Sequence, residues 1–216
     1  MGFNTDKQTL DDLNIIGKPG TDSVYSLYNN TYTRGGADIL EQMFLYPLGD
    51  AAAINNRSAT LQYFSTIKVK FPFKTELLDS AEIYMAMTDQ RTKLTHDNNN
   101  LGRKIGNLIS ADGDYKVIHN GIIAIMALLH NLSDFVGQIQ LSALKTPYHN
   151  DVKQMTTLLN DPGIASLVAE KQTSKLSYNE VVGHDNLLRF TFRLKIKELL
   201  TCIYNLDVYI SIAEVA

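Results

Sequence analysis

The sequence is poor in cysteine, which limits both its covalent architecture and its chemistry. A single cysteine, Cys202, excludes an internal disulfide in this 216-residue chain. Its neighbours at helical spacing, Leu199, Ile203 and Leu206, are apolar. We therefore interpret Cys202 as a small buried apolar residue and not as a reactive thiol. Hydrophobic residues make up 44% of the chain. This content predicts a folded protein with a sizeable core, in one domain or two coupled subdomains.

Neither sign of charge dominates the chain. Lysine and arginine together number 20, and aspartate and glutamate 23, which gives a formal net charge of -3. Such a chain has no overall electrostatic attraction to nucleic acid, so contact with DNA would require a local basic patch. The charge balance argues against a stand-alone DNA-binding protein.

Long apolar runs are also absent. The longest uninterrupted run, residues 121–129, is far shorter than the roughly 20 residues that cross a bilayer. The N-terminus lacks the basic and then apolar layout of a signal peptide. We predict a cytoplasmic protein that makes no contact with a membrane.

Recognisable catalytic motifs are missing. The phosphate-binding pattern G-x-x-x-x-G-K-[ST] is absent, because Gly17-Lys18 is followed by Pro19 and lacks the earlier glycine. The five histidines show neither the H-E-x-x-H pattern nor a cysteine pair. His184-Asp185 is the pair that suggests acid–base chemistry, but no nucleophile or third ligand accompanies it at suitable spacing. We predict no enzyme activity, no catalytic residue, no bound cofactor and no metal site for this chain.

Nearly every segment shows helical periodicity, and no run of four or more residues alternates cleanly between apolar and polar. The prediction is an all-α fold, a multi-helical core with long antiparallel lever helices. Thr146-Pro147 and Asp161-Pro162 are read as caps followed by first-turn prolines. Asp112-Gly113-Asp114 is expected to form a turn and a cap. The expected helices are 9–13, 23–28, one ending before Pro47, one capped by Asp50 and ending near 67, 74–87, 101–110, 114–145, 147–160 and 162–171.

Two segments carry a seam of apolar residues at alternating steps of four and three. Such a seam packs along another helix, and we hypothesise that the two lie side by side, within one molecule or across a dimer. The first seam consists of Ile118, Ile122, Ile125, Leu129, Leu132, Val136, Ile139 and Ala143; the second of Phe192, Ile196, Leu199, Ile203, Leu206, Ile210 and Ala213.

The segment 29–48, NNTYTRGGADILEQMFLYPL, has the most distinctive punctuation in the chain. Thr31 or Thr33 can cap a helix, Gly35 and Gly36 let its first turn approach another backbone, and Pro47 forbids its continuation. Two glycines without a wider fingerprint are better explained by close packing than by anion binding.

With its flanking residues, this segment resembles the start of the core domain of MutS-type DNA mismatch repair proteins. A second stretch, 185–213, resembles the last core helix of that family, although Asn186 stands where the family pattern has histidine. The resemblance covers nearly the whole chain. The residues that carry it, with structural roles, are Thr31, Thr33, Gly36, Leu40, Pro47, Leu48, Arg57, Asp185, Arg189, Leu206 and Asp207.

The resemblance implies that residues 1–216 form a core and lever module. Residues 1–110 would be core helices, 111–171 lever helices, and 172–216 a return to the core that leads to an absent ATPase domain. The tight turn at 146–148 leaves no room for a clamp domain, so the chain resembles members without clamp and mismatch-recognition domains. The parent protein would be a homodimeric ATPase that uses ATP and Mg and contacts double-stranded DNA. The end of the chain inside an apolar helical pattern fits an excised domain.

The densest basic stretch offers possible DNA-phosphate contacts through Arg189, Arg193, Lys195 and Lys197. A solvated helix face is the ordinary explanation for such a stretch. On such a face we expect Arg189 to pair with Asp185, one helical turn earlier, for a few tenths of a kcal/mol. Three functions stay open at this point. They are a non-catalytic lever module of a MutS-related ATPase, a module that binds branched or distorted DNA directly, and a free-standing helical dimerisation protein.

Overall fold

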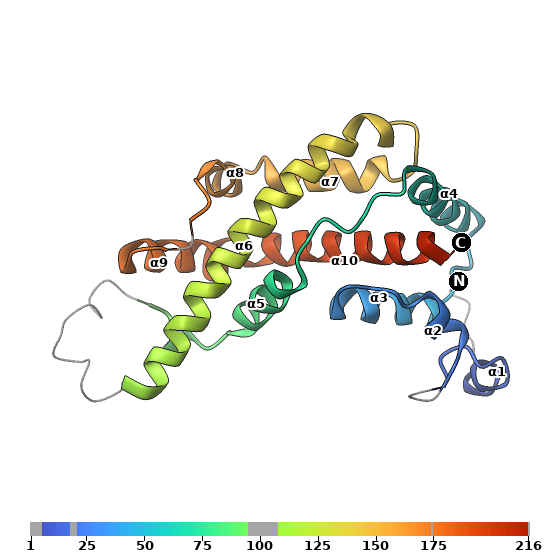
Figure 1. The fold of residues 1–216 in the computed structure, drawn as a ribbon, viewed down its shortest axis with the longest axis horizontal. Coiled ribbons are helices and arrows are strands. Elements are labelled where there is room, and N and C mark those ends of the chain that lie inside the picture. The colour runs from blue at the N-terminus through green and yellow to red at the C-terminus, as the bar shows by residue number, and fades with distance from the viewer. Residues whose placement is uncertain (1–5, 18–20, 95–107, 174, 216) are drawn as a thin grey trace. The chain divides into compact units, whose positions relative to one another are not determined.

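The computed structural model describes residues 6–17, 21–94, 108–173 and 175–215 (Figure 1). Every regular element within these ranges is a helix, and none of the residues in them lies in a strand. The predicted all-α fold is confirmed. The expected helix 101–110 falls mostly outside the described residues.

The helices follow one another along the chain with short connections. Most have the bounds that the sequence pattern predicts to within two or three residues. In order they are α1 (Lys7–Asp12), α2 (Val24–Tyr28), α3 (Arg34–Leu45), α4 (Ala51–Ile67), α5 (Thr75–Ala86), the short 3-10 helix η1 (Gln90–Thr92), α6 (Leu108–Ala143), α7 (His149–Leu159), α8 (Pro162–Ala169), α9 (Tyr178–Asp185), the π-helical η4 (Asn186–Thr191) and α10 (Arg193–Val215).

Side-chain caps fix the starts of several helices. Thr33 accepts the backbone N–H of Gly36 at the start of α3, and Asp50 accepts that of Ala53 at the start of α4. Asp161 caps α8, where Pro162 occupies the first turn without loss of a hydrogen bond. These three predicted caps are confirmed because each motif is local and needs no tertiary partner.

Two predicted boundaries are wrong. Helix α6 begins at Leu108, so the backbone is already helical through 112–114, where the sequence predicts a turn and a cap. Helix α7 begins at His149 and not at Pro147. The residues before it form a tight turn instead, since Thr146 donates both its N–H and its hydroxyl to the carbonyl of Ala143.

The described helices belong to two compact units made from separate stretches of chain. Unit 1 comprises residues 1–72, 138–154 and 200–216, and unit 2 comprises 73–137 and 155–199. Helix α6 therefore belongs to unit 2 up to Gly137 and to unit 1 from Gln138. Helix α10 changes unit between Leu199 and Leu200. The predicted division into core, lever and return is a division by role and stays a prediction.

Unit 1 has an aromatic core. Phe64 of α4 lies edge-on to Tyr148, with ring centroids 4.7 Å apart, and stacks on Tyr209 of α10 at 5.8 Å. Tyr63 reaches Ser142 of α6 through a hydroxyl–hydroxyl hydrogen bond of 2.7 Å. These ring contacts bring together α4, α10 and the residue just before α7 in this unit.

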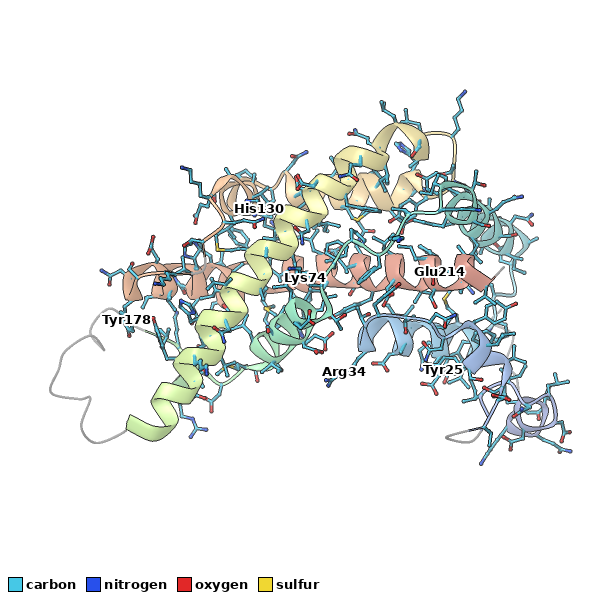
Figure 2. The ribbon with its side chains drawn as sticks, viewed as in Figure 1. Tyr25, Arg34, Lys74, His130, Tyr178 and Glu214 are labelled. Carbon is cyan, nitrogen blue, oxygen red and sulfur yellow. The ribbon has the colours of Figure 1, made fainter. Side chains whose placement is uncertain are left out.

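Unit 2 is built on the buried part of α6. A Cβ at Gly121 would overlap the ring of Tyr84, so this glycine allows α5 to pack directly against α6. Tyr178 of α9, labelled in Figure 2, stacks on Tyr115 of α6 with ring centroids 5.8 Å apart. Gly121 therefore serves close helix packing, which explains why it is tolerated inside a long helix.

The first predicted seam is buried along its whole length, from Ile118 to Ala143, and the second is buried from Ile196 to Ile210. Residues on other faces of α6, such as Ala124, Leu128 and Phe135, are buried as well. The segment Gly113–Ala143 is long enough to cross a membrane and contains an 18-residue window apolar enough to do so, with a mean hydropathy of 1.5, by length and composition alone. A buried core helix has the same composition.

The burial of α6 gives a test of the dimerisation hypothesis. Leu129 is 3% exposed and Leu141, on the same helix, is 81% exposed. We expect Leu129→Asp to cost about 4 kcal/mol or more of unfolding free energy, because it buries an unpaired carboxylate. Leu141→Asp should stay within about 0.5 kcal/mol of the parent chain. Urea denaturation checks both. A folded, monomeric Leu129→Asp variant of a dimeric parent would show instead that the seam is a subunit interface.

Candidate functional site

The last helical run of the chain contains two buried carboxylates, Asp185 and Asp207. The run begins with α9, passes through η4 and continues as α10, with only Phe192 between the last two elements. Asp185 lies in unit 2 and Asp207 in unit 1. An ionised carboxylate is costly to bury, so each must accept hydrogen bonds from its surroundings. We call each carboxylate with its hydrogen-bond partners a junction.

Asp207 joins α10 to the start of α3 in unit 1. One carboxylate oxygen accepts the backbone N–H of Tyr32 at 3.0 Å. The other accepts the N–H of Thr33 at 2.8 Å and the hydroxyl of Thr33 at 2.7 Å. The same hydroxyl oxygen accepts the N–H of Gly36 at 2.9 Å. Thr33 is therefore at once the cap of α3 and the link from α3 to Asp207.

Two glycines allow this approach. A Cβ at Gly36 would overlap the Asp207 carboxylate, and a Cβ at Gly35 would overlap the ring of Tyr204. The sequence correctly assigns both glycines to close packing, but what they admit is a pair of side chains from α10 and not another backbone. Neither position tolerates a side chain unless its neighbour moves.

Ser211, one helical turn after Asp207, extends the same junction. Its hydroxyl accepts the backbone N–H of Asn30 at 2.9 Å and donates to the carbonyl of Tyr28 at 2.7 Å. Asp207 and Ser211 together hydrogen-bond to the backbone N–H groups of Asn30, Tyr32 and Thr33 and to the carbonyl of Tyr28, at the link between α2 and α3. An irregular segment is thereby held by side chains where no helix or sheet ladder is available.

Burial raises the pKa of Asp207, and the hydrogen bonds from Tyr32 and Thr33 oppose that rise. The carboxylate is fully buried. Its donors among the described residues are Tyr32 and Thr33, and neither is a cation. The geometry suits fixation of a helix start and offers no open position for a substrate.

Asp185 forms the junction in unit 2 together with Arg189. The Arg189 Nε and Nη2 atoms donate to the two carboxylate oxygens at 2.5 and 2.6 Å, and the hydroxyl of Tyr84 donates at 2.9 Å. The remaining guanidinium hydrogens reach the hydroxyl of Thr92 at 2.9 Å and the carbonyls of Thr92 and Met87 at 3.2 and 3.3 Å. The network ties the last helical run to α5 and to the segment that follows it.

The predicted pairing of Asp185 with Arg189 is present, but its setting differs from the exposed helix surface that the sequence suggests. Arg189 is 2% exposed, and its guanidinium also lies over the rings of Tyr84 and Phe190. A bidentate, fully hydrogen-bonded pair of this kind depends strongly on both partners being present. Burial raises the pKa of Tyr84, and the neighbouring Asp185 raises it further, so the tyrosine stays a donor.

Arg189 lies in the π-helical turn η4. A π-helical turn inside an α-helix is rare and often occurs where a side chain has a special position to fulfil. Here it places Leu188 and Arg189 in the interior of unit 2. No pattern in the sequence predicts this element.

The four residues predicted to contact DNA phosphates have different surroundings, and their contact with DNA stays a prediction. Arg189 has almost no exposed area to offer a phosphate. Arg193 donates to the carbonyl of Met85 at 2.6 Å, and Lys195 pairs with Asp161 at 2.5 Å. Lys197 is exposed and also takes part in interactions within the chain. Arg189, Arg193 and Lys195 therefore make contacts inside unit 2.

His184 and Asp185 do not act on each other as a catalytic pair would. His184 contacts the carbonyl of Glu180 through Nδ1 at 2.6 Å and the carboxylate of Glu170 through Nε2 at 2.8 Å. Asp185 turns to Tyr84 and Arg189. Within the part of the chain that the structure describes, no three His, Cys, Asp or Glu side chains gather as metal ligands.

The remaining residues of the family-like pattern are structural in different ways. Thr31 donates its hydroxyl to the side chain of Asn29 at 2.6 Å and does not cap α3. Leu40 and Leu206 are fully buried, whereas Pro47 and Leu48 are half-buried just after α3. Arg57 lines a pocket of unit 1 together with Asp38 and Tyr209.

Sequence reasoning missed several partners in these junctions. Tyr84 and Thr92 lie about 100 residues before Asp185 and Arg189, and nothing in the local pattern of α5 sets Tyr84 apart from other core residues. Ser211 and Tyr204 had a weak signal, since both fall inside the family-like stretch.

Comparison of the chain with protein-family models, with curated proteins and with solved structures found no match. The geometry of the two junctions therefore has to carry the functional argument.

The Thr33 hydroxyl can be tested directly. Thr33→Val removes a donor to Asp207 and the acceptor of the Gly36 N–H while keeping the shape of the side chain. We expect a loss of about 1–2 kcal/mol in unfolding free energy. Thr33→Ser, which keeps the hydroxyl, should lose much less. Chemical denaturation of both variants measures the difference, and equal losses would show that the methyl group matters more than the hydrogen bonds.

The Asp185–Arg189 pair gives a second prediction. Arg189→Met leaves the Asp185 carboxylate buried with Tyr84 as its one remaining side-chain donor, so we expect a loss of about 3–5 kcal/mol. Tyr84→Phe removes one donor and keeps the ion pair, and should cost about 1 kcal/mol. Thermal and urea unfolding of the two variants test this order. The assignment fails if Tyr84→Phe is the more damaging change.

Proposed function

We propose that this chain is the non-catalytic core and lever module of a MutS-related DNA repair protein, and that it couples an ATPase domain to DNA-facing parts. The observation that carries the proposal is the Thr33–Asp207 junction. Thr33 and Asp207 come from the two stretches of sequence that resemble the family; they lie 174 residues apart and share hydrogen bonds in the interior of unit 1. A contact between residues of both stretches supports the proposal.

The last helical run has the properties that a lever requires. It belongs to unit 2 at its start and to unit 1 at its end, and a buried carboxylate fastens it within each unit. Movement of the helix at one end must therefore either carry the α3 start with it or break buried hydrogen bonds. Coupling between distant sites depends on such rigid elements with discrete arrangements.

The proposal also defines partners. The chain would act beside its own ATPase domain, which binds ATP and Mg, within a cytoplasmic homodimer whose other parts contact double-stranded DNA. The chain itself would perform no chemistry. Direct recognition of DNA by the predicted basic stretch is the weaker proposal, because Arg189 and Arg193 are engaged inside unit 2.

The native protein provides the test. An antibody raised against this chain should detect, in the cells of origin, a band well above the 24.1 kDa of the chain alone. The purified native protein should hydrolyse ATP faster with DNA than without it. A native band at 24.1 kDa would overturn the proposal.

The coupling can be measured in the same native protein. Thr33→Val should lower the ratio of DNA-stimulated to DNA-free ATP hydrolysis, and Thr33→Ser should preserve it, because only the first breaks the Asp207 junction. An unchanged ratio in Thr33→Val would contradict the lever role. Strongly salt-dependent binding of the isolated chain to branched DNA would favour the DNA-binding alternative, since phosphate contacts release counterions.

A further inference from the structure

Unit 1 contains an open pocket of about 400 Å³ whose walls come from three helices. This volume lies within the range of small-ligand sites. The junctions at Asp207 and Asp185 do not use it. Its lining consists of Asp38, Ile39, Gln42 and Met43 from α3, Tyr46 just after that helix, Arg57 from α4, and Asn205 and Tyr209 from α10.

Arg57 is the distinctive group in this pocket. It is half-buried, and its guanidinium makes no hydrogen bond or ion pair with any residue that the structure describes. Burial lowers the pKa of Arg57, which nevertheless stays charged at neutral pH. A partly desolvated cation without an internal partner is stabilised by an anion, and a planar guanidinium matches a carboxylate with two parallel hydrogen bonds.

Asn205 and Tyr209 of α10 add hydrogen-bond donors to the pocket. The Tyr209 ring is held by Phe64 and Tyr148, at centroid distances of 5.8 and 5.9 Å. Burial raises the pKa of Tyr209 to about 12, so its hydroxyl keeps its proton at neutral pH. The side chains of Asn205 and Tyr209 make no hydrogen bond with the described residues, which leaves both able to serve a ligand.

The rest of the lining limits the kind of ligand. Ile39, Met43 and the exposed ring of Tyr46 form apolar walls, which suit an apolar or aromatic body. Asp38 is the acid of the pocket and leaves it with one cation and one anion, a balance that disfavours phosphates and other multiply charged anions.

We propose that this pocket binds an organic monoanion, a carboxylate on an apolar or aromatic body, with the carboxylate held by Arg57. A free small acid and an acidic side chain of a polypeptide share this chemistry. The inference does not rest on the proposed lever function, because it uses only the lining of unit 1.

The test is a protein-observed NMR titration of the full 216-residue chain with phenylacetate up to about 10 mM, which covers weak affinities. Its matched probes are neutral phenylacetamide and the dianion phenyl phosphate. The peptides acetyl-Phe-Glu-Phe-amide and acetyl-Phe-Gln-Phe-amide represent the polypeptide source. We expect phenylacetate, or the Glu peptide, to shift the resonances of Asn205 and Tyr209, and the neutral partner of each pair to bind at least about tenfold more weakly.

Variants assign the contact. Arg57→Gln should weaken binding of the anionic probe by at least about tenfold. Asp38→Asn should bind it as tightly as the parent chain or more tightly, because the nearby negative charge is gone. Tyr209→Phe, which keeps the ring in the aromatic core, should lose severalfold in affinity while its thermal unfolding stays close to that of the parent chain.

Each result has a defined meaning. Binding of phenylacetate alone identifies a free acid as the source, and binding of the Glu peptide alone identifies a polypeptide; both support the proposal. It is overturned if neither binds, if phenylacetamide or phenyl phosphate binds as well as phenylacetate, or if a folded Arg57→Gln variant binds unchanged. If Arg57→Gln does not fold, two other results together overturn the proposal. These are an unchanged affinity of Tyr209→Phe for phenylacetate and equal binding of phenylacetamide and phenylacetate to the parent chain.

Discussion

The hydrogen bonds that Asp207 accepts from Tyr32 and Thr33 are the constraint on which unit 1 depends. They fix where α3 begins, and the direction of α3 in turn sets where Leu40 enters the core and which of its residues face α10. A buried carboxylate needs hydrogen-bond donors for both of its oxygens. The backbone of 30–33 and the cap of α3 can therefore take few other conformations while α10 stays in place.

Unit 2 uses a different solution to the same problem. There the buried carboxylate is neutralised by Arg189, and the pair is closed by a tyrosine hydroxyl and by backbone carbonyls of the segment after α5. Asp207 takes two of its three donors from the backbone, the N–H groups of Tyr32 and Thr33 in the link before α3, and the third from the Thr33 hydroxyl. At Asp185 the surrounding helices already use their amides, so the donors have to come from side chains.

Local signals explain why much of the fold could be predicted. Asp50, Asp161 and Thr33 cap helices through contacts within three residues, and the heptad spacing from Ile118 to Ala143 correctly marks a buried helix. The predictions were wrong where a local signal competes with tertiary packing: 112–114 is helical despite its turn residues, and the helix after Thr146-Pro147 starts two residues late. The Asp185–Arg189 spacing predicted the pair but could not predict its burial, because that depends on Tyr84 and Thr92, which are distant in sequence. Four cations lie close together in this part of the sequence, and the partners that three of them have within unit 2 could not be predicted from spacing alone.

The π-helical turn at 186–191 is equivalent to one extra residue inserted into a helix. An α-helix turns by about 100° per residue, so the insertion resets the angular position of everything after it relative to everything before it. The turn lies wholly within unit 2, where it places Leu188 and Arg189 in the interior. Loss of a single residue between Asp185 and Arg189 would keep every member of this junction in the chain and yet turn Arg189 by about 100° from its present direction.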